Sequence, residues 1–206
     1  MTSIGREMPH RRITARMREL RFDAGALSLN LVATVGRRPD TPIERLGDEE
    51  RLHAWCRGVG TVLDDSEDPA EVLALLHELR DAAYEIAAAA VCGRRPQLEA
   101  VELLNRAALV EPPTPQLRLT ATGVEAAEAG RQLSGPGLRS LIARDLITIM
   151  SDEKLRKRLR ACDSDNCRMI YLDSAQGKPR KWCSMQRCGN SAKAAQHRLR
   201  VADSGR

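Results

Sequence analysis

Apolar residues recur at helical spacing along most of the chain, in segments separated by Gly, Pro and Asp residues. The clearest segment runs from Asp68 to Gly93. Asp68 is a good N-cap, Pro69 fits the first helical position, and Gly93 lies where the pattern ends. The apolar stripe between them consists of Val72, Leu75, Leu76, Leu79 and Ile86. The pattern therefore predicts a long amphipathic helix.

Four other segments show the same spacing. They are residues 26–35, closed by Gly36 and Pro39; residues 48–59, capped by Asp48, with Leu52, Trp55 and Val59 on one face; residues 96–110, stopped by EPPTP; and residues 137–150, with Leu138, Leu141, Ile142 and Ile149. Glycine and proline end such segments because neither continues a helix well. The helices would pack as a bundle, so the fold class that we predict is mainly α.

Two regions depart from the helical pattern. QLRLTAT, residues 116–122, alternates apolar and polar residues, which predicts a short strand or hairpin. Further along, Ser151 and Asp152 form a fresh helix cap, and EKLRKRLR then leads straight into Cys162. Beyond that cysteine, RMIYL and PRKW predict two short strands joined by DSAQGK, whose Gly177 can supply a positive φ angle.

These patterns divide the chain into three parts. Residues 1–20 are a basic arm with a weak helical pattern, residues 21–151 a helical domain, and residues 152–206 a small C-terminal domain. The hydrophobic share of 42% suits a globular core, and the aromatic share of 2% with many Leu, Ala, Val and Ile favours helices over a large β-sandwich. No apolar run reaches the roughly 18 to 20 residues of a membrane span, and the charged N-terminus lacks a secretory signal. We expect a soluble, cytoplasmic protein.

Charge is unevenly distributed. The formal net charge is +5, but residues 151–206 carry 14 Lys and Arg against 6 Asp and Glu, while residues 1–150 carry 19 against 22. A basic domain attached to a mildly acidic one suggests a polyanion as the partner of the basic part.

Four of the six cysteines lie in that basic part, with the spacing Cys162-x4-Cys167-x15-Cys183-x4-Cys188. Two short-spaced pairs are typical of a structural zinc site, in which four thiolates surround one ion tetrahedrally. Asp, Asn, Ser and Gly between and after the pairs suit the tight turns that such a site needs. An iron–sulfur cluster, a disulfide or a redox switch are the alternatives, although reducing cytosol disfavours disulfides. One bound zinc is the interpretation that we favour.

After Cys188, a last helix runs to about Arg200, with Asn190 or Ser191 as its cap. A turn with the first cysteine pair (the first knuckle), a hairpin, a turn with the second pair (the second knuckle) and a helix follow one another in the order of a treble-clef-like zinc finger. Ala192, Ala195 and Leu199 could dock the helix on the zinc unit. The candidate contacts to double-stranded DNA are Lys193, Gln196, His197 and Arg200 toward bases and Arg180, Lys181, Arg187 and Arg198 toward phosphates. The alternative is a solvated basic face.

The remaining candidates for chemistry are isolated. His53, His77, Cys56 and Cys92 have no ligand spacing, so we expect packing or surface roles. Trp182 is expected to pack over the zinc knuckle. Sequence motifs of zinc proteases, P-loop enzymes, serine hydrolases and dinucleotide-binding enzymes are absent, and a four-cysteine zinc site is closed to substrate. We therefore expect no enzyme activity.

The cysteine segment, together with KAAQHRLR, closely resembles the CGNR zinc-finger family of bacteria, named for a Cys-Gly-Asn-Arg motif. Cys188, Gly189 and Asn190 match, and Ser191 stands where the family has arginine. Upstream, FDAGALSLNLVATVGRRPD and RLGDEERLHAWCRGVG are similar to the helical domain of stress-induced transcription regulators. Its Leu-Asp-Phe-Val-Asn-Thr run corresponds here to residues 29–34, LNLVAT.

The resemblance implies a transcription regulator, and the charge and cysteine spacing independently favour DNA binding. In this hypothesis the zinc unit holds the last helix, while the helical domain senses an unknown small-molecule effector or forms a homodimer. Two alternatives are an RNA- or protein-docking zinc module, which the scarcity of aromatic residues disfavours for RNA, and a redox sensor built on labile zinc thiolates.

Overall fold

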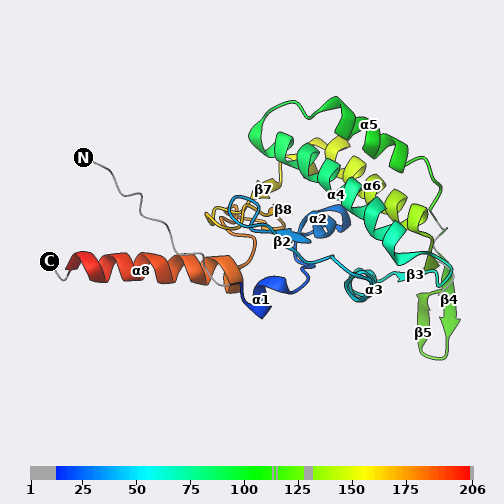
Figure 1. Cartoon of the computed structure of the whole chain (residues 1–206), viewed down its shortest axis with the longest axis horizontal. Helices are drawn as coiled ribbons and strands as arrows, with labels where there is room; N and C mark the ends of the chain where they lie inside the picture. Colours follow the sequence, from blue (N-terminus) through cyan, green and yellow to red (C-terminus); the bar gives the residue numbers. More distant parts are fainter. Residues whose placement is uncertain (1–12, 113, 115, 128–131, 205–206) are drawn as a thin grey trace.

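The computed structural model shows a helical body, a small cysteine-bearing unit packed against it, and a C-terminal helix that extends away from both (Figure 1). The structure describes residues 13–112, 114, 116–127 and 132–204, with the backbone alone at residues 126, 196, 198, 199 and 201–204. Most of the predicted basic arm, residues 1–12, lies outside the described residues. Within the rest of the arm, α1 is one short turn of helix, Ala15–Arg18.

Helices dominate the described part of the chain, as predicted. The other helices are α2 (Leu27–Val32), α3 (Glu49–Gly58), α4 (Pro69–Cys92), α5 (Leu98–Ala107), α6 (Gly135–Ser151), α7 (Glu153–Arg156), the π-helix η2 (Met185–Gly189) and α8 (Asn190–Ser204). The strands are β1 (Val35–Gly36), β2 (Ile43–Glu44), β3 (Val62–Leu63), β4 (Leu117–Thr120), β5 (Gly123–Ala126), β6 (Gln132–Leu133), β7 (Leu159–Ala161) and β8 (Ile170–Leu172). They pair as β1–β2, β4–β5 and β7–β8, antiparallel, and β3–β6, parallel.

Local capping explains where the long helices begin and end. The Asp68 carboxylate accepts a hydrogen bond from the Ala70 amide at the start of α4, and Gly93 ends the helix with φ 66°. Asp48 caps α3 in the same way, through the amide of Arg51. The predicted helices at 48–59 and 68–93 are thereby confirmed almost to the residue.

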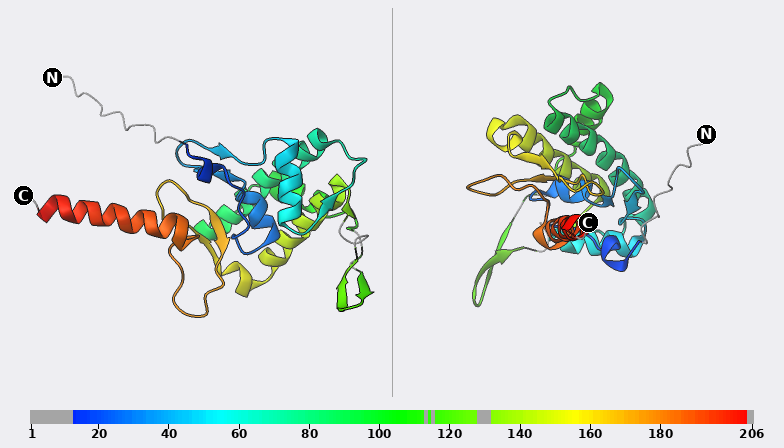
Figure 2. Two further views of the ribbon diagram at one scale, coloured as in Figure 1. Left: turned by 90° about the horizontal axis from the view of Figure 1, so that it is seen from below. Right: turned by 90° about the vertical axis from the view of Figure 1, so that its left-hand side faces the viewer.

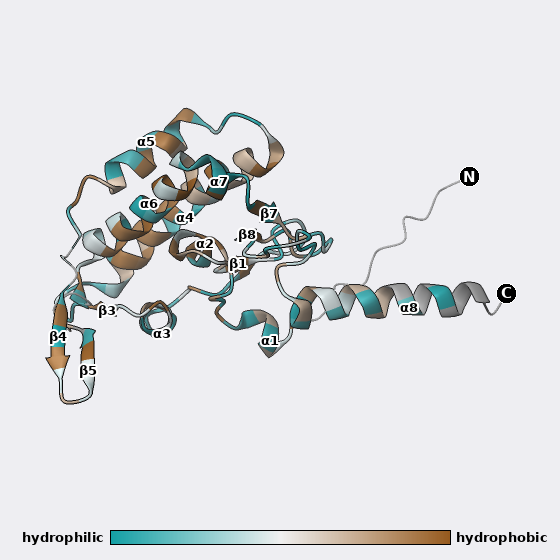
Figure 3. Cartoon of the chain, turned by 180° about the vertical axis from the view of Figure 1, so that it is seen from behind, coloured by the Kyte–Doolittle hydropathy of each residue, from teal (hydrophilic) through white to brown (hydrophobic). Residues whose placement is uncertain are grey.

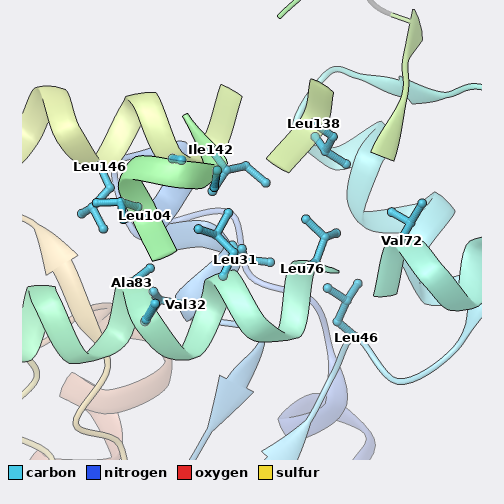
Figure 4. Close-up of a cluster of buried hydrophobic side chains, with 14 of the residues drawn as sticks. Leu31, Val32, Leu46, Val72, Leu76, Ala83, Leu104, Leu138, Ile142 and Leu146 are labelled. Atoms are coloured by element: carbon cyan, nitrogen blue, oxygen red, sulfur yellow. The ribbon is translucent and has the colours of Figure 1, made fainter. Parts of the chain in front are cut away.

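The body is held together by one cluster of buried apolar side chains from α2, α3, α4, α5 and α6 (Figure 4). Leu31, Leu76, Leu138 and Leu146 in this cluster have no exposed surface. Each fully buried leucine of this kind stabilises the fold by about 1.5–3 kcal/mol relative to an exposed one. Val72, Leu76, Leu79 and Ile86 of the stripe predicted for α4 lie in this cluster, whereas Leu75 is half-buried and outside it, and Leu73 packs against the cluster instead.

A second buried cluster joins the body to the cysteine unit. It contains Ala24, Leu29, Ala33, Ala87 and Ile149 from the body, and Leu159, Met169, Ile170, Tyr171 and three of the cysteines from the unit. The Leu172 amide also donates a hydrogen bond of 2.8 Å to the Ala24 carbonyl. In the left view of Figure 2 the cysteine unit lies against the body, while α8 points away from both. The unit is thus fixed on the body rather than tethered to it.

Three details differ from the sequence prediction. The helix expected over 26–35 ends at Val32, and Val35–Gly36 forms β1 instead. The segment EKLRKRLR gives only the short α7 before Leu159–Ala161 turns into β7. β7 then pairs with β8, the expected RMIYL strand, and no strand forms at PRKW. The first cysteine pair therefore lies in the loop of the hairpin rather than before it.

The strand or hairpin expected at residues 116–122 is present as β4–β5. Leu117, Leu119 and Val124 are 78%, 83% and 65% exposed, and the register Leu119↔Val124 places two of them side by side. Figure 3 shows this hairpin as an apolar projection from the body. None of the helices in the described ranges is long and apolar enough to span a membrane.

Candidate metal centre and nucleic-acid interface

The four cysteines of the sequence pattern converge at one point. Cys162 follows β7, Cys167 lies in the β7–β8 loop, Cys183 precedes η2, and Cys188 lies within η2. Their sulfur atoms all lie within 4.8 Å of one another. Three of them are buried and Cys167 is half-buried. The fold has therefore gathered thiols that are up to 26 residues apart in the sequence into one cluster that could hold a metal ion.

The geometry fits a single tetrahedral ion. The Sγ atoms of Cys167 and Cys183 are 3.7 Å apart, and those of Cys183 and Cys188 are 3.6 Å apart. Four sulfurs at about 2.3 Å from one zinc ion would be separated by about 3.8 Å. A disulfide requires about 2.05 Å, and a four-iron cluster places each cysteine on a different iron, which needs wider spacing. The donor set thus fits zinc better than either alternative.

Backbone hydrogen bonds shape the two knuckles. The Cys167 amide donates to the Ser164 carbonyl, and the Cys162 amide to the Met169 carbonyl, both at 2.9 Å. Arg168 adopts φ 49°, so the chain reverses directly after Cys167. In the second knuckle, the Cys188 amide donates to the Ser184 carbonyl at 3.0 Å, and a turn of π-helix carries the chain into α8. The second knuckle and the last helix are therefore continuous.

Arg21 reaches the thiol cluster from the body. Its Nη1 donates to Cys183 Sγ at 3.4 Å, while the guanidinium also pairs with Asp23 at 2.6 Å. Hydrogen bonds from the thiols of Cys162, Cys167 and Cys188 lower the pKa of Cys183, and the Arg21 charge lowers it further. A thiolate, the form that binds metal, is therefore favoured at Cys183. Nothing in the sequence indicated this role for Arg21, because it lies more than 140 residues before the cysteines.

The loop between β8 and the second knuckle is held by Asp173, which is 5% exposed. Its carboxylate accepts hydrogen bonds from the Arg180 amide and from Arg180 Nε, at 3.0 and 2.9 Å. The Tyr171 hydroxyl donates to the Arg180 carbonyl at 2.7 Å, and the Arg180 guanidinium lies 4.9 Å from the Tyr171 ring centroid. Arg180, a predicted phosphate contact, is thus fixed within the unit's own fold with its side chain partly exposed.

The structure distributes the other predicted DNA contacts over two regions. Lys181 is exposed beside the second knuckle, and Lys193, His197 and Arg200 are exposed on α8. Arg187 is half-buried and pairs with Glu19 at 2.7 Å, so it joins η2 to the arm. The side chains of Gln196 and Arg198 lie outside the described residues.

The expected docking of α8 on the zinc unit is limited to its first turns. Ala192 and Ala195 are half-buried, and the side chain of Leu199 is not described. The helix packs on η2, and the remainder extends away from the body (Figure 1 and the left view of Figure 2). Asn190 and Ser191 do not cap α8, because η2 already precedes it; Asn190 has helical backbone angles, and Ser191 Oγ donates to the Arg187 carbonyl at 2.9 Å.

Comparison with known families agrees with this organisation. A family model with the description "putative stress-induced transcription regulator", ABATE, matches residues 25–153, more than half of the chain. The chain belongs to the ABATE family. A second model, the CGNR zinc finger, matches residues 158–201, which include all four cysteines. Neither family is described as an enzyme. No curated protein matches this ABATE-family chain.

The segment LNLVAT of this ABATE-family chain lies in and just after α2. Asn30 Oδ1 accepts a hydrogen bond from the Ala24 amide at 3.1 Å, and Thr34 Oγ1 accepts one from Arg80 Nη1 at 3.0 Å. These polar residues therefore hold the body together. The isolated candidates take structural positions, as expected: Cys56 is buried, which raises the pKa of its thiol to about 11, and His77 Nε2 lies 2.7 Å from the Leu46 carbonyl.

Proposed function

We propose that this ABATE-family chain regulates transcription by binding double-stranded DNA through its cysteine unit and α8. The observation that carries the proposal is the projection of α8, a basic helix attached at its N-terminal end to a four-thiol cluster and otherwise directed away from the body (Figure 1). A helix placed in this way can approach a duplex without interference from the body.

Cys162, Cys167, Cys183 and Cys188 would hold one structural zinc, which supplies a closed crosslink between the two knuckles. The chain's own residues then orient α8. Cys188 and Gly189 lie in η2, directly before the helix, and a Cβ at Gly189 would meet the side chains of Met185 and Trp182. This tight packing supports the proposal that the unit fixes the direction in which α8 leaves.

The dimensions and charges of α8 suit a major groove. Its 15 residues span about 22 Å at about 1.5 Å per residue, and the groove is about 12 Å wide and accepts a helix. Lys193 and His197 are exposed on the helix, and Lys181 and Arg180 lie at its base, where phosphates would run. In this proposal Lys193, Gln196, His197 and Arg200 face bases, and Arg180, Lys181 and Arg198 bind the backbone.

The division of the chain into residues 1–20, 21–151 and 152–206 is part of the same proposal, with the middle part controlling the last. We also infer that the chain forms a homodimer through β4–β5. The exposed side chains of Leu117, Leu119 and Val124 support this, because an isolated two-stranded hairpin is only marginally stable. A second copy would present an identical apolar face.

The test is selection of sequences from fragmented genomic DNA by the zinc-loaded full chain near physiological salt. A chain with both Cys183 and Cys188 replaced by Ser is the control. The proposal predicts that the native chain alone enriches a common sequence, with affinity that falls steeply with salt as condensed counterions are released. Equal retention of all DNA by both chains would overturn it, and tighter binding to single-stranded or structured RNA would favour the RNA-docking alternative.

A further inference from the structure

A cavity of about 250 Å³ lies where the arm, the body and the cysteine unit meet. Five arginines from all three parts line it: Arg16, Arg21, Arg37, Arg45 and Arg187. Among the described residues that line the cavity, none is Asp or Glu. So many cations around one small space strongly favour an anion.

Three of these arginines have carboxylate partners outside the cavity. Arg21 pairs with Asp23, Arg37 with Asp40, and Arg187 with Glu19. Arg45 is different. Within the ranges that the structure describes, no carboxylate lies at ion-pair distance from its guanidinium, although the residue is only 8% exposed. An unpaired charge buried to this extent is costly and is expected to have a counterion.

The Arg45 guanidinium is held rigidly in place. Its Nε donates to the Met17 carbonyl at 2.8 Å, and its Nη1 donates to the Ala33 carbonyl at 2.9 Å. It lies against Gly36, where a Cβ would overlap the guanidinium. Burial lowers the pKa of Arg45 to about 10, and repulsion from Arg21 and Arg187 contributes to the shift. The site is therefore preorganised, and an anion would relieve its electrostatic cost.

The thiolates beside the cavity offset only part of the charge of its five arginines. Cys167 and Cys188 form part of its wall, and the nearby charge of Cys167 favours the charged form of Arg45. However, the hydrogen bond to a cysteine sulfur comes from Arg21. In the described part of the chain, the Arg45 guanidinium makes hydrogen bonds only to carbonyl oxygens. Among the described residues Nη2, which lies against Gly36, has no hydrogen-bond partner, so its donor capacity is available to a ligand.

We propose that this cavity binds a small phosphate monoester, which acts as an effector of the regulator. Arginine guanidinium groups match the geometry of phosphate oxygens and bind them in a bidentate manner. The apolar side chains of Met17, Val35 and Met169 line the same space and would contact the carbon skeleton. The volume of about 250 Å³ suits a small metabolite.

Binding there would act on the DNA-binding part directly. The walls include Arg45 and Gly36 from the body, and Arg187 and Ser191 from η2 and the first turn of α8. A phosphate bound to Arg45 and Arg187 together would draw the base of α8 toward the body and restrict its direction. This consequence rests on the proposed function, whereas binding of the anion itself does not.

The experiment is calorimetric titration of the zinc-loaded full chain, without DNA, with inorganic phosphate and then glycerol 3-phosphate. We expect saturable binding of one anion per chain, weakened at least tenfold in Arg45→Met. Arg118→Met, which removes an exposed arginine on β4, should bind like the native chain. Arg45→Met also removes two hydrogen bonds to backbone carbonyls and could disturb the fold, so a second variant is needed. Ser191→Glu places a carboxylate at the rim of the cavity from an exposed position. It should abolish binding without unfolding the chain.

Two outcomes would overturn the proposal. One is absence of saturation, or equal binding by all four chains, which would indicate weak association with the basic surface. The other combines two results: a short DNA duplex displaces the phosphate, and Arg45→Met weakens DNA binding as much as phosphate binding. The cavity would then be a site for a phosphate of the DNA backbone. Saturable, Arg45-dependent phosphate binding in a chain that fails to select DNA would leave the cavity site standing and overturn the proposed function alone.

Discussion

Four arginines, Arg21, Arg37, Arg45 and Arg80, are each less than 9% exposed, and three of them illustrate different ways to stabilise a buried cation. Arg80 pairs with Glu44 at 2.8 Å and donates to Thr34. Arg21 combines the Asp23 carboxylate with the sulfur of Cys183. The Arg45 guanidinium donates to two carbonyl oxygens and pairs with no carboxylate among the described residues. The contacts of Arg80 stabilise the body, and those of Arg21 support the cysteine cluster. The contacts of Arg45 leave it able to bind a ligand.

At this scale we predict that Glu44→Gln destabilises the body by about 2 kcal/mol, because it removes the carboxylate partner of buried Arg80. The value is below that of a fully buried pair, since the Glu44 side chain is 38% exposed. Urea unfolding of the zinc-loaded chain measures the change. Glu102→Gln, which removes an exposed helical pair with Arg106, is the control and should cost less than about 0.5 kcal/mol.

The stabilisation that the ion pair between Glu44 and Arg80 contributes should depend on pH. Burial alone would raise the pKa of Glu44, but the hydrogen bond from Arg80 outweighs it, and the net shift is downward. The stabilisation is therefore complete well above the unfolded pKa of about 4.3 and is lost as the pH falls through the lower folded pKa. The difference between native and Glu44→Gln chains should narrow below about pH 4; a difference that stayed constant would contradict the ion pair.

A second prediction concerns Arg21. Partners that hydrogen-bond to metal ligands change affinity by about 10- to 100-fold when removed, so Arg21→Met should weaken zinc binding at least tenfold. Competition with a chromogenic chelator measures this directly. Arg18→Met, on the exposed side of α1, is the matched control and should retain native affinity. Equal zinc transfer from both variants would mean that the contact between Arg21 and Cys183 is incidental.

At the scale of elements, α8 has an unusual position for a helix of its length. It packs on η2 and has little other support, and isolated helices of about 15 residues are marginal in water. We predict that Ala194→Pro, at an exposed site within the helix, lowers DNA affinity at least tenfold and leaves zinc content unchanged. Ala194→Gln keeps a good helix former and should bind DNA like the native chain. Unaltered binding by the proline variant would exclude α8 as the reading element.

The hairpin β4–β5 carries the prediction about assembly. Leu117→Thr with Leu119→Thr keeps β-forming residues but removes the apolar face, so the dimer should dissociate at micromolar concentration. Arg118→Thr changes the opposite face and should leave the dimer intact. Analytical ultracentrifugation distinguishes the two. A native chain that is monomeric throughout this range would show that the hairpin serves another purpose.

Some elements could be predicted from the sequence because their signals are local. Asp68, Pro69 and Gly93 define α4 by capping and backbone preference alone, and the cysteine spacing indicated which four thiols converge. The β7 strand could not be predicted, because Leu159 lies in a basic segment typical of a helix. It becomes a strand because Leu159 is buried between the body and β8. The arginine-lined cavity could not be predicted from the sequence either, because only folding brings Arg21, Arg45 and Arg187 together.

At the scale of the whole molecule, the two matched families share one continuous structure. β7 and β8 contact α4, β8 also contacts α2, and the second buried cluster draws residues from both parts. The cavity lies at the same junction, beside Ala33 on one side and Cys188 on the other. A change in the body can therefore reach η2 and α8 through packed side chains, without a hinge between them.

This arrangement predicts a graded response to metal removal. The cysteine unit lacks a core of its own and needs the metal to fold, whereas the cluster around Leu76 and Leu138 contains no residue of that unit. Chelation should therefore remove amide protection at Ile170 and Tyr171, weaken it at Leu29, and leave α4 and α6 protected. Hydrogen exchange followed by mass spectrometry measures all three.

Tryptophan emission provides an independent measurement, because Trp55 is fully buried in the body cluster and Trp182 is half-buried beside Cys183. On chelation the native chain should show a red shift from Trp182. The Trp182→Phe chain, which reports Trp55 alone, should show none. If Trp55 shifted as well, and α4 lost protection together with Ile170, the metal would hold the entire molecule, because the two buried clusters would then unfold as one cooperative unit.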